Sequence, residues 1–125
     1  MTEEWEWKVG CAGPVSPGAA LAQLRARAAE GGFEAWLTSG SGRQLAVVSN
    51  AERAMVLLLE GAGDPGEHAV DPDVEGWSAG FVLANGQDDE YPDEDTVPIG
   101  RALTIVEHIL TTGRPSADTP WSVDR

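Results

Sequence analysis

The chain has 125 residues, of which 42% are hydrophobic, and this length predicts one domain with a hydrophobic core of its own. Its 21 acidic and 8 basic residues give a net charge of -13, which disfavours binding to nucleic acid or to anionic membranes, because both need cationic side chains. Cys11 is the only cysteine, so we expect no intrachain disulfide and no cysteine-based zinc or iron-sulfur site. We also expect no cofactor.

The first 15 residues alternate Trp5, Trp7 and Val9 with charged residues, which predicts either an edge strand or an N-terminal arm. The acidic start has neither the basic segment nor the apolar run of a secretory signal. The longest strongly apolar run, residues 54–59, is too short to cross a bilayer. We therefore expect a cytoplasmic protein in which residues 16–125 form a single domain.

A helix and three strands are predicted between residues 16 and 59. Ser16 and Pro17 favour a helix start, because Ser accepts hydrogen bonds from free amides and Pro fits the first helical position. The helix should end at Gly31-Gly32. Three short apolar runs separated by polar turns then indicate an antiparallel meander. These runs are Phe33 to Thr38, Gln44 to Ser49 and Ala54 to Leu59.

The third apolar run shows no polar alternation at Met55 to Leu59, so we expect it to be a central strand covered on both faces. Trp36, on the first of the three strands, is expected in the core. Residues 61–76 contain several Gly and Pro residues and no clear period, which predicts a long surface loop.

An Asn85-Gly86 pair between two apolar or alternating segments predicts a hairpin. A three-residue loop with a glycine bulge would place Asp89 and Tyr91 on the same face as Phe81, and Asp88 on the opposite face. A two-residue turn would instead put two carboxylates, those of Asp88 and Glu90, beside Leu83 and Phe81. Burying unpartnered carboxylates costs several kcal/mol, so the bulged register is preferred.

A second helix is expected from about Pro98 to Thr112, with Gly113 as its left-handed terminator. Trp121 is expected to anchor the tail by packing. The predicted fold class is α+β: an antiparallel sheet, made of a meander and an Asn-Gly hairpin, packed against two helices in a single domain.

The negative charge is confined to one part of the chain. Twelve acids and no Lys or Arg lie between Glu60 and Asp95, whereas the rest of the chain holds nine acids and eight bases. Residues 88–95 alone contain six carboxylates in eight positions. A solvated acidic loop would also keep the protein soluble. Concentration in one segment instead favours electrostatic steering towards a cationic partner.

Motifs of catalytic or metal sites are incomplete in this sequence. Residues 71–76 begin like a calcium loop, but the position that requires a bidentate Glu is occupied by Val82. His68 and His108 do not have the spacing of a metal pair, and no serine lies in a GxSxG motif. We therefore assign no catalytic residue and no metal ligand, and we expect no enzyme. An enzyme that uses paired carboxylates or a loosely held metal is the third-ranked alternative.

Seven short motifs follow one another in a distinctive order and spacing in the second half of the chain. They are Asp71-Pro72, Leu83-Ala84-Asn85-Gly86-Gln87, Glu90-Tyr91-Pro92, Val97-Pro98, Ala102-Leu103, Gly113-Arg114-Pro115 and Trp121-Ser122. Through these motifs, the region from Gly80 to Trp121 resembles the first-numbered immunity-protein family of bacterial polymorphic toxin systems. The tail departs from the family, because Trp121 lies six positions after Pro115 instead of five.

The resemblance implies an immunity protein that binds a cognate toxin domain, including toxins of the nucleobase deaminase type, and neutralises it. A nucleic-acid-directed toxin holds phosphates in a basic cleft, which an acidic face can cover. We expect a monomer that binds the toxin one to one, with no nucleic acid or membrane as partner. The alternative is a small acidic binding or scaffold protein with another basic protein partner. The residues expected to face the toxin are Trp77, Asp88, Asp89, Glu90, Tyr91, Asp93, Glu94 and Asp95.

Overall fold

The computed structural model describes residues 4–7, 14–61, 63–83, 86–115 and 117–123. Within these ranges the chain forms two α-helices, one short 3₁₀-helix (η1) and ten strands. In chain order they are β1 (Trp5–Trp7), β2 (Pro14–Val15), α1 (Pro17–Glu30), β3 (Phe33–Ser39), β4 (Gln44–Ser49), β5 (Arg53–Leu59), β6 (Glu67–Ala69), β7 (Trp77–Val82), β8 (Asp88–Pro92), η1 (Asp93–Asp95), β9 (Val97–Pro98), α2 (Ile99–Thr112) and β10 (Trp121–Val123).

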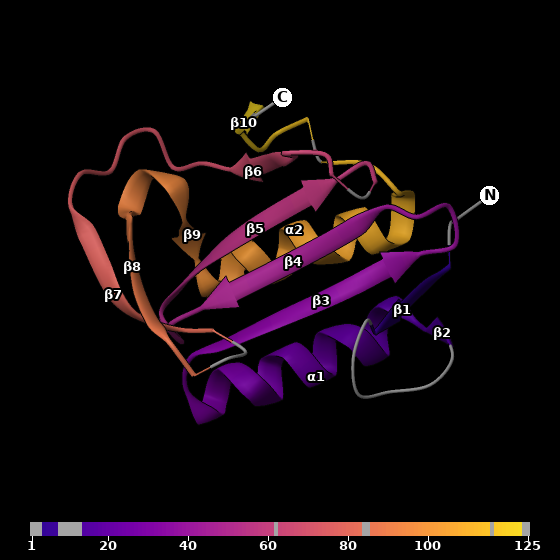
Figure 1. Cartoon of the computed structure of the whole chain (residues 1–125), viewed down its shortest axis with the longest axis horizontal. Coiled ribbons are helices and arrows are strands. Elements are labelled where there is room, and N and C mark those ends of the chain that lie inside the picture. Colours follow the sequence, from indigo (N-terminus) through magenta and orange to yellow (C-terminus); the bar gives the residue numbers. More distant parts are fainter. Residues whose placement is uncertain (1–3, 8–13, 62, 84–85, 116, 124–125) are drawn as a thin grey trace.

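Eight strands of the described chain form one antiparallel sheet, in the order β10-β6-β5-β4-β3-β1-β2, with β9 pairing β5 beyond the end of β6. β7 and β8 form a separate two-stranded hairpin, which Figure 1 shows beside the start of β3 and the end of β4. The fold is α+β, with a meander and a hairpin packed against two helices, as predicted.

Both helices begin and end where their capping residues predict. The Ser16 side chain accepts a hydrogen bond from the amide of Ala19 at 3.2 Å, and Gly31 follows the last turn of α1. α2 ends at Gly113, which has φ +80° and donates its amide to the carbonyl of Ile109 at 2.7 Å. These contacts satisfy backbone groups that a helix end leaves without partners.

The core lies between the helices and one face of the sheet. Alternate residues of β3, β4 and β5 point towards the helices, and each buried aliphatic side chain contributes about 1.5–3 kcal/mol. Trp5 and Trp7 of β1 are 2% and 9% exposed and belong to the same core, so this segment packs as a strand between β3 and β2. The strand residues of this core are Phe33, Ala35, Leu37, Leu45, Val47, Ala54, Val56 and Leu58.

The opposite face of the sheet carries more apolar residues than a solvated face requires. Met55, Leu57 and Leu59 of β5 are only half-buried, so the prediction that this strand is covered on both faces is wrong. Trp36 is also half-buried on this face, and its Nε1 donates a hydrogen bond to Glu34 at 2.6 Å. The helices cover only the other face, and Figure 1 shows no element in front of the middle of β3, β4 and β5.

The predicted long loop, residues 61–76, contains the short strand β6, which pairs with both β5 and β10. Trp121 of β10 lies opposite Ala69 of β6 and packs against the core, which confirms that it anchors the tail. Neither described helix combines the length and the apolar character that crossing a membrane would require.

Candidate functional site

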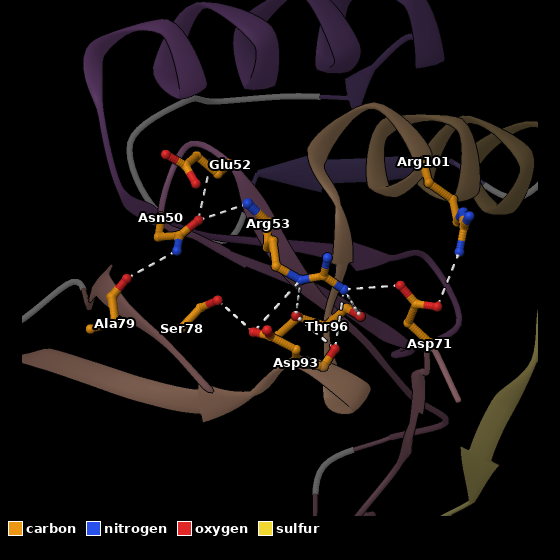
Figure 2. A network of polar contacts seen from close by, with 9 residues as sticks. All are labelled: Asn50, Glu52, Arg53, Asp71, Ser78, Ala79, Asp93, Thr96 and Arg101. Atoms are coloured by element: carbon orange, nitrogen blue, oxygen red, sulfur yellow. Dashed lines mark hydrogen bonds and ion pairs between the residues drawn. The ribbon is translucent and has the colours of Figure 1, made fainter. Parts of the chain in front are cut away.

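The acidic segment is attached to the sheet by one arginine. Arg53 begins β5, and its side chain is only 17% exposed (Figure 2). Its Nε donates to the hydroxyl of Thr96 at 2.8 Å, and its Nη2 donates to the carboxylate of Asp71 at 3.1 Å. Nη2 also donates to the backbone carbonyls of Asp93 at 3.1 Å and Thr96 at 2.9 Å. Arg53 therefore fixes the end of η1 and the loop before β7 at the same point.

Acids of the basic-free segment are neutralised by arginines that lie outside it. Glu60, at the start of the segment, contacts Nε of Arg43 at 2.8 Å. Asp71 contacts Arg53 with one carboxylate oxygen and Arg101 with the other, the latter at 3.8 Å. Asp93 accepts a hydrogen bond from the hydroxyl of Ser78, and its carboxylate lies 4.0 Å from Nε of Arg53. The charge map of the sequence therefore overstates the free negative charge of this region.

The turn between β4 and β5 holds the hairpin from the other side. Asn50 donates its side-chain amide to the carbonyl of Ala79 at 2.9 Å. Its Oδ1 accepts hydrogen bonds from the amides of Glu52 and Arg53 at 3.0 and 2.7 Å (Figure 2). Asn50 and Arg53 thus connect one turn to β7 and to η1.

His68, which the sequence left without a role, is half-buried on β6. Its Nε2 lies 3.0 Å from Oδ1 of Asp95. The contact joins η1 to the sheet at a second point, about one turn of chain after the contact of Arg53 with Asp93. Asp95 is therefore engaged within the chain, although its side chain is 40% exposed.

The inner face of the hairpin packs against the sheet. Phe81 is fully buried and makes an edge-to-face contact with Tyr91, with ring centroids 4.9 Å apart. The Tyr91 hydroxyl donates to Asp89 at 3.1 Å. Burial, the hydrogen bond to Asp89 and the negative charges of Asp89 and Glu34 raise the pKa of Tyr91 from 10.0 to about 12. Tyr91 is thus held protonated and directed inward.

The bulged register of the hairpin is confirmed. Phe81 lies opposite Asp89, Val82 lies opposite Asp88, and the amide of Leu83 donates to the carbonyl of Gln87 at 2.8 Å. Gly86 has φ +86°, as a glycine bulge requires, whereas Asn85 lies outside the described residues. A second bulge between Ser78 and Phe81 was not predicted.

The outer face of the hairpin, which we define as Trp77, Asp88, Glu90 and Pro92, points away from the sheet. Trp77 is 66% exposed and lies opposite Pro92 in the ladder. Asp88 and Glu90 are exposed on the same side of β8, and Glu94 is exposed on η1 just beyond. Among the described residues, none provides these three carboxylates with an ion-pair partner. The outer face therefore combines an exposed aromatic ring with unpaired negative charges.

The eight residues predicted to face a toxin divide into three groups in the structure. Trp77, Asp88, Glu90 and Glu94 lie on or beside the outer face of the hairpin. Asp89 and Tyr91 lie on its inner face, and Asp93 and Asp95 are held by Arg53, Ser78 and His68. Strand alternation in β8 separates Asp88 and Glu90 from Asp89 and Tyr91, and this signal was available in the sequence. In β7, plain alternation would place Trp77 on the same face as Phe81, and the bulge between Ser78 and Phe81 places it on the outer face instead. The role of Arg53 was not available, because nothing local links it to η1.

The residues of the incomplete calcium motif do not converge. Asp71 is directed towards Arg53 and Arg101, while Asp73 and Glu75 are exposed. Throughout the ranges that the structure covers, no three His, Cys, Asp or Glu side chains are arranged to hold a metal ion.

No protein-family model, no curated protein and no solved structure matches this chain. The resemblance to immunity proteins therefore rests on the sequence motifs alone.

Proposed function

We propose that this protein is a non-catalytic inhibitor, an immunity protein that binds a basic cleft of a cognate toxin domain in the cytoplasm. The observation that carries the proposal is the outer face of the hairpin. It exposes two-thirds of Trp77 on the same face as the free carboxylates of Asp88 and Glu90, with that of Glu94 just beyond on η1. Large aromatic residues in the centre of an interface contribute most of its binding energy.

The electrostatic part of the proposal depends on which acids are free. Asp71 and Asp93 are compensated by arginines and contribute little to the outward field. Asp88, Glu90 and Glu94 are exposed on one side of the molecule, where they attract a cationic surface and raise its association rate.

A toxin that acts on DNA or RNA presents the matching surface. Such an enzyme needs a basic groove for phosphates, and carboxylates on a rigid hairpin can occupy the positions that phosphates would take. The resemblance to immunity proteins supports this class of partner and a one-to-one complex. The same face would also fit another basic protein, so the test must include the toxin itself.

We expect the gene directly upstream to encode a protein with a toxin-like C-terminal domain, and the test is co-expression with that domain, scored by cell survival. Protection supports immunity, and no protection together with no complex would overturn it.

Association rates of the purified complex then test the contact face. Asp88→Lys combined with Glu90→Lys should slow association at low salt by about tenfold or more and flatten its salt dependence. The matched control is Glu30→Lys with Glu107→Lys, which makes the same charge change at exposed positions of the helices. Equal effects of the two double variants would show that net charge matters and the outer face does not.

A further inference from the structure

We infer that a hollow beside Trp77 receives an arginine side chain of the protein partner. This inference rests on the proposed function, because it names the group that the outer face of the hairpin recognises. The hollow has a volume of about 260 Å³ and is lined by Val74, Glu75, Gly76, Trp77, Pro92 and Glu94.

The hollow is built from paired backbone. Trp77 and Pro92 are direct partners in the hairpin ladder, and they supply its apolar wall. The amide of Asp93 donates to the carbonyl of Gly76 at 2.9 Å, which joins η1 to the residue before β7. Asp93 is in turn held by Arg53 and Ser78. The shape of the hollow is therefore fixed by the same contacts that attach η1 to the sheet.

The apolar wall of the hollow is the feature that indicates a binding partner. Trp77 and Val123 are the two large apolar residues that are exposed in the described chain, and Trp77 is the more exposed of them at 66%. A Trp ring with this exposure gains free energy when another group covers it. Pro92 is half-buried next to it, so an incoming group would contact two apolar surfaces at once.

The rim of the hollow selects the charge of that group. Glu75 and Glu94 are both exposed and line the hollow together with the apolar wall. No lining residue is cationic. A side chain that enters must therefore carry a positive charge to complement two carboxylates, and it must also have apolar surface for Trp77.

Arginine satisfies both conditions better than lysine. Its guanidinium is planar and weakly hydrated, so it stacks on an indole ring. Its N–H groups then point outward in the plane of the guanidinium. Those N–H groups can pair with a carboxylate in a bidentate manner. A lysine ammonium is a compact and strongly hydrated charge, which loses more hydration against an apolar wall.

A second hollow on the other side of Glu94 lacks these features. It measures about 250 Å³ and is lined by Val70, Pro72, Glu94, Asp95 and Ser122. It has no aromatic wall, and its Asp95 already contacts His68. The arginine site is therefore assigned to the Trp77 side.

The experiment titrates the full chain with three short peptides that differ only in a central Arg, Lys or citrulline between glycines. NMR follows the indole N–H signal of Trp77, assigned with Trp77→Phe. The Arg peptide should shift this signal and bind about threefold or more tightly than the Lys peptide, while the uncharged citrulline peptide should bind weakest. Trp77→Ala should abolish the preference for Arg over Lys.

Matched charge variants separate the hollow from general acidity. Glu75→Gln and Glu94→Gln should each weaken the Arg peptide about threefold or more. Asp73→Asn and Glu107→Gln remove the same charge from exposed positions that do not line the hollow, and they should change binding less than twofold. Equal binding of the Arg and Lys peptides, or equal losses in all four variants, would overturn the inference.

The two proposals can fail separately. Arg-selective binding at Trp77 without protection against the toxin would remove the immunity function and leave the arginine site. Protection that is retained in full in Trp77→Ala and Glu75→Gln, with unchanged lifetimes of the toxin complex, would remove the arginine site and leave the immunity function.

Discussion

Arg53 contacts Thr96, which lies 43 positions further along the chain, and Asp71, which lies 18 positions further. All three side chains lie away from bulk water, where unpaired charges are costly. Without the guanidinium of Arg53, the partly buried carboxylates of Asp71 and Asp93 would lose the positive charge that both of them contact. A single residue in β5 thus holds two parts of the acidic segment, η1 and the loop before β7.

We expect Arg53→Met to destabilise the protein by about 3 kcal/mol, because it leaves partly buried carboxylates without their partner. Urea denaturation followed by circular dichroism measures the change. Arg101→Met is the control, since its side chain is 51% exposed and 3.8 Å from Asp71. It should cost about 1 kcal/mol or less. A cost for Arg53→Met as small as that of the control would contradict the anchoring role.

Tyr91 is the only tyrosine of the chain, so absorbance at alkaline pH reports its ionisation alone. We expect a midpoint near pH 12 in the folded protein, compared with 10.0 for an unperturbed tyrosine. Asp89→Asn should lower the midpoint, although burial should keep it above the ordinary value. A midpoint of 10 in the folded wild-type chain would show that the ring is not packed as described.

The same shift affects stability at high pH. The folded state holds the Tyr91 proton more tightly than the unfolded chain does. Its contribution to stability is therefore complete below pH 10 and is lost as the pH rises towards 12. Unfolding midpoints measured across this range should fall more steeply for the wild type than for Tyr91→Phe.

Among the secondary-structure elements, the hairpin shows how a physical argument can fix a register. The cost of burying both Asp88 and Glu90 beside Phe81 predicted the register in which only Asp89 lies opposite that ring. The ladder confirms this. The bulge between Ser78 and Phe81 contains Gly80, whose φ is +88°, and a glycine inside a strand is a local signal for a bulge that the prediction did not use.

β5 shows the opposite outcome. Its unbroken apolar run predicted burial on both faces, yet only Ala54, Val56 and Leu58 are buried. An apolar pattern states which residues tolerate burial, and the number of layers in the fold decides which are covered. With both helices on one side, Leu57 and its neighbours have no complete cover from the described chain.

The closest approach between the hairpin and the sheet is at Gly32. A Cβ placed there would lie 2.7 Å from the carbonyl oxygen of Gly80 and 2.9 Å from that of Ser49. We expect Gly32→Ala to destabilise the protein by about 1–3 kcal/mol, because backbone must shift. Gly18→Ala is the control, since nothing lies within 4 Å and α1 favours Ala there. Thermal unfolding should show a higher midpoint for the control and a lower one for Gly32→Ala.

At the scale of the whole molecule, the sequence predicted the layers better than the edges. Helix caps and strong apolar runs located α1, α2 and β3 to β5. The strands β6, β9 and β10 have two or three residues each. They form through pairing with other segments: β6 and β9 pair with β5, and β10 pairs with β6. For the site, alternation in β8 could separate Asp88 and Glu90 from Asp89 and Tyr91, but the exposure of Trp77 depends on the bulge in β7 and on the placement of the hairpin.

The net charge of -13 predicts a response of the whole protein to salt. Two like charges about 7 Å apart repel by roughly 0.6 kcal/mol in water, and salt screens this repulsion. The urea midpoint should therefore rise between 10 mM and 500 mM NaCl. A variant with Asp88, Glu90 and Glu94 changed to Gln should respond less. A midpoint that falls with salt would mean that pairs such as Arg53 with Asp71 outweigh the repulsion.

The turn that holds Asn50 and Arg53 connects the hairpin and η1 to a central strand. Groups anchored in this way lose little conformational freedom when a partner arrives, because the ordering is already complete in the free protein. Complex formation should then resemble the meeting of two rigid bodies, with heat effects dominated by the contacts themselves and no coupled folding step.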